Sequence, residues 1–331
     1  MKKLLLILLA FSFIIMISCK EKETEKEFME IITESTSYNA EGVMETYFMD
    51  STKQSTFKVC YKSPDSIKIT LSKVNNNDSQ VIIKNSEGVF VLVPSINKNF
   101  KIKSDWPTNG SYPYLLTSLT KDIANTENAI ITEDELTKTI ETNTSFYKDA
   151  KATKQKIILD KETYLPKEVI VYNSQGEVYI KVVFTSIELD AQIDDKEFVV
   201  NDSMETMRAI ITDTEYEERS IKYPNYVPTG SKLENEHTES NLDGSVVNSI
   251  MTYTGEASFT VVQEYVNDKE TLTFAQESGY IIHVMGIPTI LKENGVQAFY
   301  EGVEYVVASN ELTYDEMIKV LASYMIEKQE K

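Results

Sequence analysis

Two histidines, His237 and His283, are the side chains of this sequence best suited to acid–base or metal chemistry at neutral pH. His237 lies in the polar run 234–239, whereas His283 alternates with the apolar residues Ile282 and Val284, as in a strand. Neither has a second imidazole or a thiolate nearby in the sequence, which a metal site would need. We therefore interpret His237 as a solvated loop residue and His283 as a half-exposed sheet residue.

Other catalytic patterns are missing from the sequence. It contains no Gly-x-Ser-x-Gly elbow, phosphate loop or dinucleotide fingerprint. Acidic pairs such as Asp194–Asp195 are uninformative, because the chain carries 52 aspartates and glutamates. We predict a protein with no enzymatic activity, metal or cofactor, and a hydrolase that uses the two histidines is the alternative.

Cys19 directly follows a segment that has the features of a signal peptide, in the usual order. Lys2 and Lys3 form a basic start, and residues 4–17 form an almost unbroken apolar run. A membrane-spanning helix needs about 20 apolar residues, and this run is shorter and is followed by charged residues. We expect residues 1–18 to be a cleaved signal peptide, and an uncleaved N-terminal anchor is the alternative.

The end of this segment is similar to the bacterial lipobox, on the evidence of Ser18 and Cys19 with Met16 before them. The resemblance implies a diacylglyceryl group on Cys19, so that fatty-acyl chains such as palmitate hold the mature protein. Two acyl chains suffice for stable anchoring, whereas one gives only reversible binding. We expect a lipoprotein on the extracytoplasmic face of the cell membrane.

The mature chain is strongly acidic and has a single cysteine. Loss of Lys2 and Lys3 with the signal peptide changes the formal charge from -19 to -21. Binding to nucleic acid or to anionic lipid requires clustered basic residues, which the sequence lacks. After lipidation of Cys19 only Cys60 remains, so no internal disulfide is expected.

The order of local patterns predicts an α+β protein. A charged tether at 19–27 precedes a helical pattern, and short strands separated by turn residues follow from Tyr38 to Val200, as in an antiparallel sheet. The run Val89–Val93 is apolar at every position, so we expect cover on both of its faces. An amphipathic pattern at Tyr112–Ile123 predicts a helix on that sheet.

A smaller α+β antiparallel domain is predicted after a polar linker at 203–222. It occupies residues 223–331 and begins with the turn-rich segment Tyr223–Gly230. Thr313 and Glu316 form a capping box before a final amphipathic helix. The preceding domain would span residues 28–202.

The first domain resembles the LolA/LolB/RseB-like half-barrel of extracytoplasmic lipoprotein carriers and regulators. The resemblance depends on the motifs at Val81–Ile83, Gly88–Pro94, Trp106–Pro107 with Tyr114–Leu116, Asp160–Tyr172 and Ile193–Phe198. Within that superfamily the sequence is similar to the GerS-related germination and sporulation lipoproteins. The second domain resembles a module of unknown function, through Tyr226–Gly230 and Tyr253–Gly255. The resemblance implies a curved antiparallel half-barrel with covering helices.

A half-barrel of this kind would bind and not catalyse, because its concave apolar face can accept an acyl chain, a peptide or a partner's apolar edge. The residues proposed for that surface are Phe90, Leu92, Trp106, Tyr114 and Leu115, which could also be ordinary core.

The resemblance implies a role in spore cortex, germination or envelope physiology, with a cell-wall amidase as the partner. An RseB-like sensor of an anti-sigma-factor system and a carrier of lipid or lipoprotein are the alternatives. Open sheet edges could also pair two copies into a homodimer.

Overall fold

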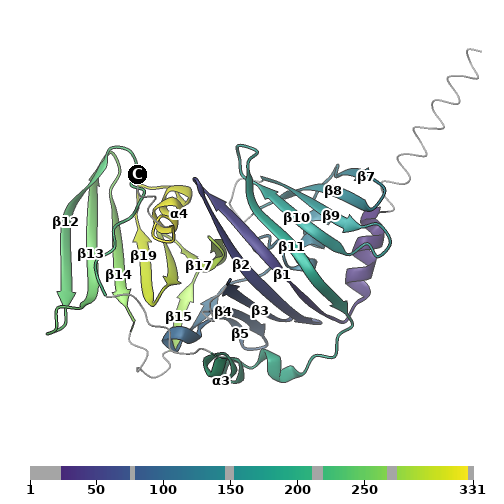
Figure 1. Ribbon diagram of the computed structural model, residues 1–331, viewed down its shortest axis with the longest axis horizontal. Coiled ribbons are helices and arrows are strands. Elements are labelled where there is room, and N and C mark those ends of the chain that lie inside the picture. The colour runs from purple at the N-terminus through teal and green to yellow at the C-terminus, as the bar shows by residue number, and fades with distance from the viewer. Residues whose placement is uncertain (1–23, 75–78, 146–152, 211–218, 267–273, 327–331) are drawn as a thin grey trace, which may run out of the picture.

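The computed structural model describes residues 24–74, 79–145, 153–210, 219–266 and 274–326. The signal peptide and Cys19 that the sequence predicts lie outside these residues. The described chain forms two open sheets, which follow one another along the long axis of the molecule (Figure 1). Within the described ranges, no helix has the length and apolar character needed to cross a membrane.

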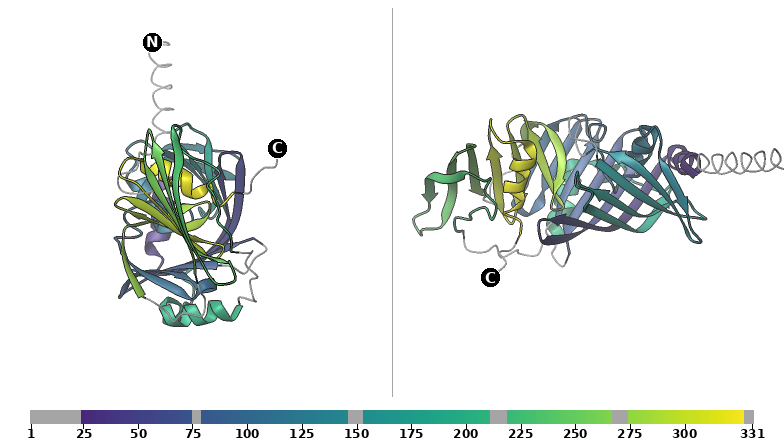
Figure 2. Two further views of the ribbon diagram at one scale, coloured as in Figure 1. Left: turned by 90° about the vertical axis from the view of Figure 1, so that its left-hand side faces the viewer. Right: turned by 90° about the horizontal axis from the view of Figure 1, so that it is seen from above.

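The larger sheet has twelve strands, and it curves around an apolar core to form a half-barrel (Figure 2). From one edge to the other, its order is β15 (Phe274–Ser278), β6 (Lys98–Lys103), β5 (Gly88–Val93), β4 (Ser79–Asn85), β3 (Ser66–Lys73), β2 (Ser51–Lys62), β1 (Ser37–Phe48), β11 (Val178–Leu189), β10 (Pro166–Tyr172), β9 (Thr153–Asp160), β8 (Thr137–Thr144) and β7 (Ile130–Glu133).

The smaller sheet has seven strands and one covering helix. Its order is β12 (Ser231–Ser240), β13 (Val246–Gly255), β14 (Phe259–Tyr265), β19 (Val303–Ala308), β18 (Gly295–Tyr300), β17 (Ile287–Lys292) and β16 (Tyr280–Val284). The helix is α4 (Tyr314–Ala322), and it begins with the predicted capping box of Thr313 and Glu316. Met317, Val320 and Leu321 bury the apolar face of α4 on the sheet. Two open, mainly antiparallel sheets with few helices confirm the predicted fold class.

The side chains of β5 are apolar on both faces of the strand because both faces are buried. Val89, Val91 and Val93 point into the half-barrel core. Phe90 and Leu92 point the other way and pack against Val200 and Met204 of α3 (Val200–Ile210). The prediction that both faces of this strand are covered is therefore confirmed.

Four short segments complete the half-barrel. A helix over residues 24–34 buries Phe28 and Ile32 in the half-barrel core, so residues 24–27 of the predicted charged tether are helical. The helix α2 (Leu116–Ala124) lies inside the curve, and two 3-10 turns, η1 (Pro94–Ile96) and η2 (Asp195–Phe198), lie at strand ends.

The predicted helix at Tyr112–Ile123 begins four residues later than expected. Pro113 disfavours helical geometry in the residue before it, so Tyr112 stays outside the helix. The backbone N–H of Tyr112 instead donates to the hydroxyl of Ser118, at 2.8 Å. The segment before α2 is therefore a loop that carries Tyr112 and Tyr114 into the half-barrel.

The two sheets are interleaved in the sequence. The strand β15 belongs to the larger sheet, although it follows β14 of the smaller sheet. It pairs with β6 in parallel, whereas all other strand pairs among the described residues are antiparallel, as the sequence predicted. The predicted linker at 203–222 is also different, since residues 203–210 lie in α3. The division of the chain into two folding units at this linker stays a prediction.

The pairing of β1 with β11 is irregular at Gly42. The register between β1 and β11 shifts between Glu41 and Gly42, as at a β-bulge. A side chain at position 42 would place its Cβ 2.1 Å from the carbonyl oxygen of Val183 and 2.7 Å from the Phe57 ring. The close approach of three strands here therefore requires glycine.

Candidate functional site at the junction of the sheets

The hollow of the half-barrel is filled by aromatic side chains from the loop between β6 and α2. Trp106, Tyr112 and Tyr114 are almost completely buried there. The Trp106 and Tyr112 rings meet edge to face, with centroids 5.5 Å apart, and Tyr114 packs on Phe57 of β2 at 5.6 Å. Because these rings occupy the concave face, it is a packed core and not an open groove.

The smaller sheet enters the same hollow and closes it. The hydroxyl of Tyr112 donates to the backbone carbonyl of Ile281 at 2.7 Å, and Tyr114 shares a hydrogen bond of 2.9 Å with Nε2 of His283. Phe299 of β18 stacks on Phe100 of β6, with centroids 4.7 Å apart. One apolar cluster therefore includes residues of both sheets.

His283 is held as a neutral imidazole by its surroundings. The residue keeps some accessible surface, as the sequence predicted, but its ring lies edge to face with both Tyr112 and Tyr114. The two tyrosine rings enclose the imidazole, and this burial lowers the pKa of His283 to about 3. A small cavity beside it has about 10 Å³ of space for water. A neutral base with so little space is poorly suited to catalysis.

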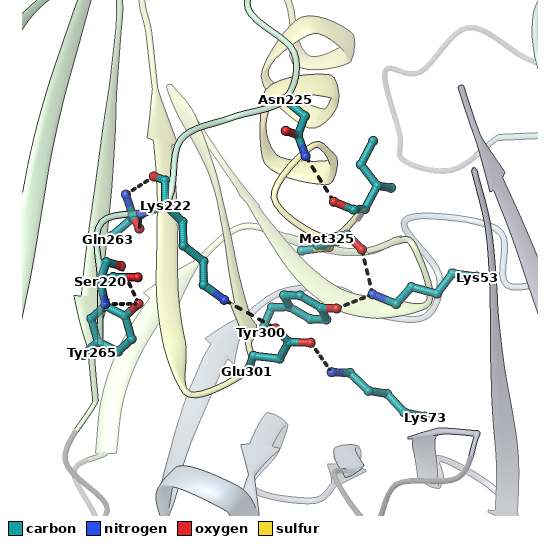
Figure 3. Close-up of polar contacts among 11 residues, drawn as sticks. Lys53, Lys73, Ser220, Lys222, Asn225, Gln263, Tyr265, Tyr300, Glu301 and Met325 are labelled. Atoms are coloured by element: carbon teal, nitrogen blue, oxygen red, sulfur yellow. Dashed lines mark hydrogen bonds and ion pairs between the residues drawn. The ribbon is translucent and has the colours of Figure 1, made fainter. Parts of the chain in front are cut away.

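Polar contacts also link the two sheets, and we call the group that makes them the clamp (Figure 3). Its residues are Lys53, Lys73, Lys222, Tyr300, Glu301 and Met325. Nζ of Lys53 in β2 donates to the hydroxyl of Tyr300 at 2.7 Å and to the carbonyl oxygen of Met325 at 2.9 Å. Nζ of Lys73 in β3 pairs with Glu301 at 3.1 Å, and Lys222 lies 3.6 Å from the other oxygen of the same carboxylate. The clamp therefore joins strands of the half-barrel to the turn between β18 and β19.

Two lysines of the clamp are stabilised by the Tyr300 ring, and lysines of the clamp in turn stabilise the ionised form of Glu301. Both lysine ammonium groups, from Lys53 and Lys73, also lie over the Tyr300 ring at 4.0 and 4.1 Å. Burial by itself would raise the pKa of Glu301, but the hydrogen bond from Tyr300 and the charges of Lys73 and Lys222 outweigh it and lower that pKa. The carboxylate is thus kept ionised where it bridges the two sheets.

Side-chain hydrogen bonds hold the segment before β12 on the smaller sheet (Figure 3). Gln263 exchanges two hydrogen bonds with the backbone of Lys222, and Tyr265 does the same with Ser220. Asn225 donates to the carbonyl oxygens of Ser323 and Ile326 after α4. The segment before β12 is therefore a strap along the smaller sheet and not a free linker.

The junction has little room for a small molecule. The pocket under the clamp holds about 20 Å³, which is space for about one water, whereas ligand pockets have roughly 300–1,000 Å³. Within the described ranges, no three histidine, cysteine, aspartate or glutamate side chains gather where they could hold a metal. The arrangement fits a contact between protein surfaces.

The five residues predicted for one binding surface lie on opposite faces of the half-barrel. Trp106, Tyr114 and Leu115 are in the filled hollow, whereas Phe90 and Leu92 lie under α3 on the outer face. The prediction of one shared surface is wrong, because alternate residues of β5 point to opposite sides of the sheet. That any of the five contacts a ligand or partner stays a prediction.

The predicted lone cysteine lies in a strand as expected. Cys60 in β2 is free and partly buried, and burial raises the pKa of its thiol. A raised pKa leaves little of the reactive thiolate at neutral pH. Cys60 therefore suits a packing role.

The residues of the clamp could not be identified from the sequence. Lys53 and Tyr300 are 247 residues apart, and Lys73 and Glu301 are 228 apart. Each of them alone is an ordinary charged or aromatic residue of a strand or turn. Only the folded chain brings them together.

A second buried polar cluster lies at the far side of the half-barrel core, around Asp122 of α2. Its carboxylate accepts hydrogen bonds from Ser111 at 2.7 Å, Gln155 at 2.8 Å and Thr144 at 3.0 Å. Burial raises the pKa of Asp122 to about 6, although these hydrogen bonds and the charge of Lys121 oppose the rise. The cluster ties α2 to β8 and β9.

Comparison with known proteins gives matches over most of the chain. The family model described as "Sporulation protein YdcC-like" matches residues 1–198. The curated sporulation protein YdcC of Bacillus subtilis (strain 168) is 30% identical over 328 residues, which cover 97% of this chain and 96% of that protein. The predicted resemblance to a sporulation protein group is thereby confirmed.

Solved structures give more distant matches. MucB in complex with MucA(peri) is 13% identical and covers 91% of this chain and 97% of its own, with a TM-score of 0.32. A LolA superfamily protein from Nitrosomonas europaea is 10% identical and covers 54% of this chain and 97% of its own, also with a TM-score of 0.32.

Proposed function

Because the chain belongs to the YdcC-like sporulation protein family, we propose that it is a membrane-anchored lipoprotein that acts in sporulation by binding an extracytoplasmic protein partner, without catalysis. The observation that carries the proposal is the closed junction. The hollow of the half-barrel is filled by the protein's own aromatic residues and by strands of its smaller sheet. Its outer surfaces and strand edges are then the parts that another molecule can reach.

The anchor in this proposal is a lipid on Cys19. Only four residues, 20–23, lie between Cys19 and Thr24, the first described residue, and an extended chain spans at most about 3.3–3.6 Å per residue. The half-barrel would therefore lie within about 20 Å of the membrane surface. The helix over 24–34 is packed into the core through Phe28 and Ile32, so the anchor is joined directly to the fold.

The closed junction favours a protein partner on the outer surface over a lipid cargo in the hollow. An acyl chain in the hollow would have to displace Trp106, Tyr112 and Tyr114. Their rings pack together, and Tyr112 and Tyr114 are hydrogen-bonded to the smaller sheet. A carrier would also have to leave the membrane, and a lipid anchor prevents that. The partner that we propose, from the resemblance to the GerS-related group, is a cell-wall amidase.

The test is recovery of partners from sporulating cells by crosslinking and affinity purification. We expect the native chain to recover a cell-wall amidase from the membrane fraction. Cys19→Ala should move the chain to the soluble fraction and reduce that recovery, whereas Cys60→Ala, the matched control, should do neither. Recovery of an anti-sigma factor, or of lipid without a protein partner, would contradict the proposed function.

A further inference from the structure

The most exposed strand of the described chain is β12, which forms one edge of the smaller sheet. Eight of its ten residues are exposed and the other two only partly covered, so neither face of the strand packs on a core. It is hydrogen-bonded to β13, and within the described ranges no strand pairs with its outer side. A row of backbone N–H and C=O groups on such an edge is a template for another strand.

Exposed apolar side chains collect around this edge. Leu233 and Ile250 are each 40% exposed, Tyr223 is 47% exposed, and Leu242 at the tip of the β12–β13 hairpin is fully exposed. Leu233 pairs with the buried Tyr253, whereas Ile250 pairs with His237 on the other face. Apolar contacts are therefore available on both faces, as the alternating side chains of an added strand require.

The charge of β12 indicates which segment could pair with it. The strand carries three glutamates, Glu234, Glu236 and Glu239, and one lysine, Lys232, in a chain whose formal net charge is -19. Antiparallel pairing of two β12 strands would bring these carboxylates together, and like charges across a strand pair are destabilising. A second copy is therefore a poor occupant, and a basic segment is a good one.

The position of β12 in the molecule suits contact with a partner. It lies at one end of the long axis, and the helix over residues 24–34 lies at the other (Figures 1 and 2). If residue 19 carries the lipid, as the proposed function states, the β12 edge points away from the membrane. A partner outside the membrane would meet this end of the molecule first.

We propose that β12 is a docking strand, which binds an extended, lysine- or arginine-rich segment of a partner protein by strand addition. The register supports a regular ladder between the two bulges of β12, over Asn235–Glu239. Main-chain hydrogen bonds would supply the affinity, and the glutamates would select the basic segment. This proposal deepens the proposed function by naming its contact surface.

The first experiment measures binding of a ten-residue peptide of alternating lysine and valine to the full chain in detergent, by fluorescence anisotropy and hydrogen exchange. Binding should slow exchange in residues 231–240, and it should weaken as salt is added. The same peptide methylated on alternate backbone nitrogens should lose binding, because it cannot complete the ladder. A glutamate–valine peptide should not bind. Equal binding of the methylated peptide, or no slowing of exchange in β12, overturns the proposal.

The second experiment changes the strand. The double variant Glu236→Lys with Glu239→Lys should weaken peptide binding about tenfold at low salt, because two attractive charges become repulsive. The matched control Glu135→Lys with Glu162→Lys makes the same charge change in turns of the larger sheet and should bind normally. Unchanged thermal unfolding shows that each variant is folded.

Pull-down with these variants separates the two proposals. If the native chain recovers a partner and the Glu236→Lys with Glu239→Lys variant recovers it equally well, the docking strand is wrong and the proposed function stands. If neither recovers a protein partner, the proposed function itself fails. A dimer of the native chain that the double variant abolishes would assign the edge to a second copy and overturn the basic-segment proposal.

Discussion

Replacing Asp122 with asparagine should stabilise the protein at neutral pH and make its stability depend less on pH. The folded-state pKa of Asp122 is raised to about 6 from the ordinary 3.8. The folded state therefore binds more protons than the unfolded state between these values, and stability falls as pH rises through this window. Above pH 6, the folded protein keeps a buried carboxylate ionised at the expense of its own stability.

The size of the effect follows from the two pKa values. A difference of about two units corresponds to about 3 kcal/mol of unfolding free energy. Asparagine has the same shape as the protonated acid and can still accept from Gln155 and Thr144, while its amide donates to Ser111. The variant should match the native protein below pH 4 and exceed it by up to about 3 kcal/mol above pH 6.

The assay is urea unfolding of the purified mature chain at a series of pH values from 4 to 7.5. The control is Asp134→Asn, because backbone hydrogen bonds from Leu136 and Thr137 lower the pKa of Asp134. Its difference from the native protein should change with pH in the opposite sense. Parallel pH profiles for native protein and Asp122→Asn, or a variant that becomes relatively weaker as pH rises, would refute the reasoning.

Three further substitutions test the junction between the sheets and the irregular strand pairing at Gly42. Phe299→Ala removes the ring stacked on Phe100 and should lower the unfolding free energy by about 3–5 kcal/mol, as measured by urea unfolding; a loss below about 1 kcal/mol would contradict this contact. Lys53→Met removes two hydrogen bonds of the clamp and should lower that free energy by about 1–3 kcal/mol, and exchange in β18 should speed up; unchanged exchange would argue against the clamp. Gly42→Ala should destabilise by at least about 1–3 kcal/mol in thermal unfolding, and a neutral result would mean that the strands separate there easily.

The local signals of the sequence predicted local structure well. The alternating runs predicted the antiparallel strands, and Thr313 and Glu316 predicted the start of α4. The run Val89–Val93 predicted cover on both faces of β5. These features depend on residues near one another in the chain, so their periods and spacings are visible without a structure.

What covers β5, and what fills the hollow, was decided only by the tertiary structure. The polar region that begins at residue 203 gave no sign that α3 would continue into it, because α3 buries only Val200, Ser203 and Met204. The edge strand β15 pairs with β6 about 175 residues earlier, and a short strand carries no mark of its distant partner.

The acidic charge of the chain, the alternation of its strands and the cap of its last helix can be predicted without a structure. Charge is a matter of composition, and the other two are properties of residues close together in the chain. Tertiary structure alone decided that the concave face is closed, that Lys53 and Lys73 clamp the turn at Tyr300 and Glu301, and that β12 is left at an open edge. Those outcomes depend on how the two sheets pack, through contacts such as that between Lys53 and Tyr300, which are 247 residues apart. Contacts at such separations leave no periodic signal in a single sequence.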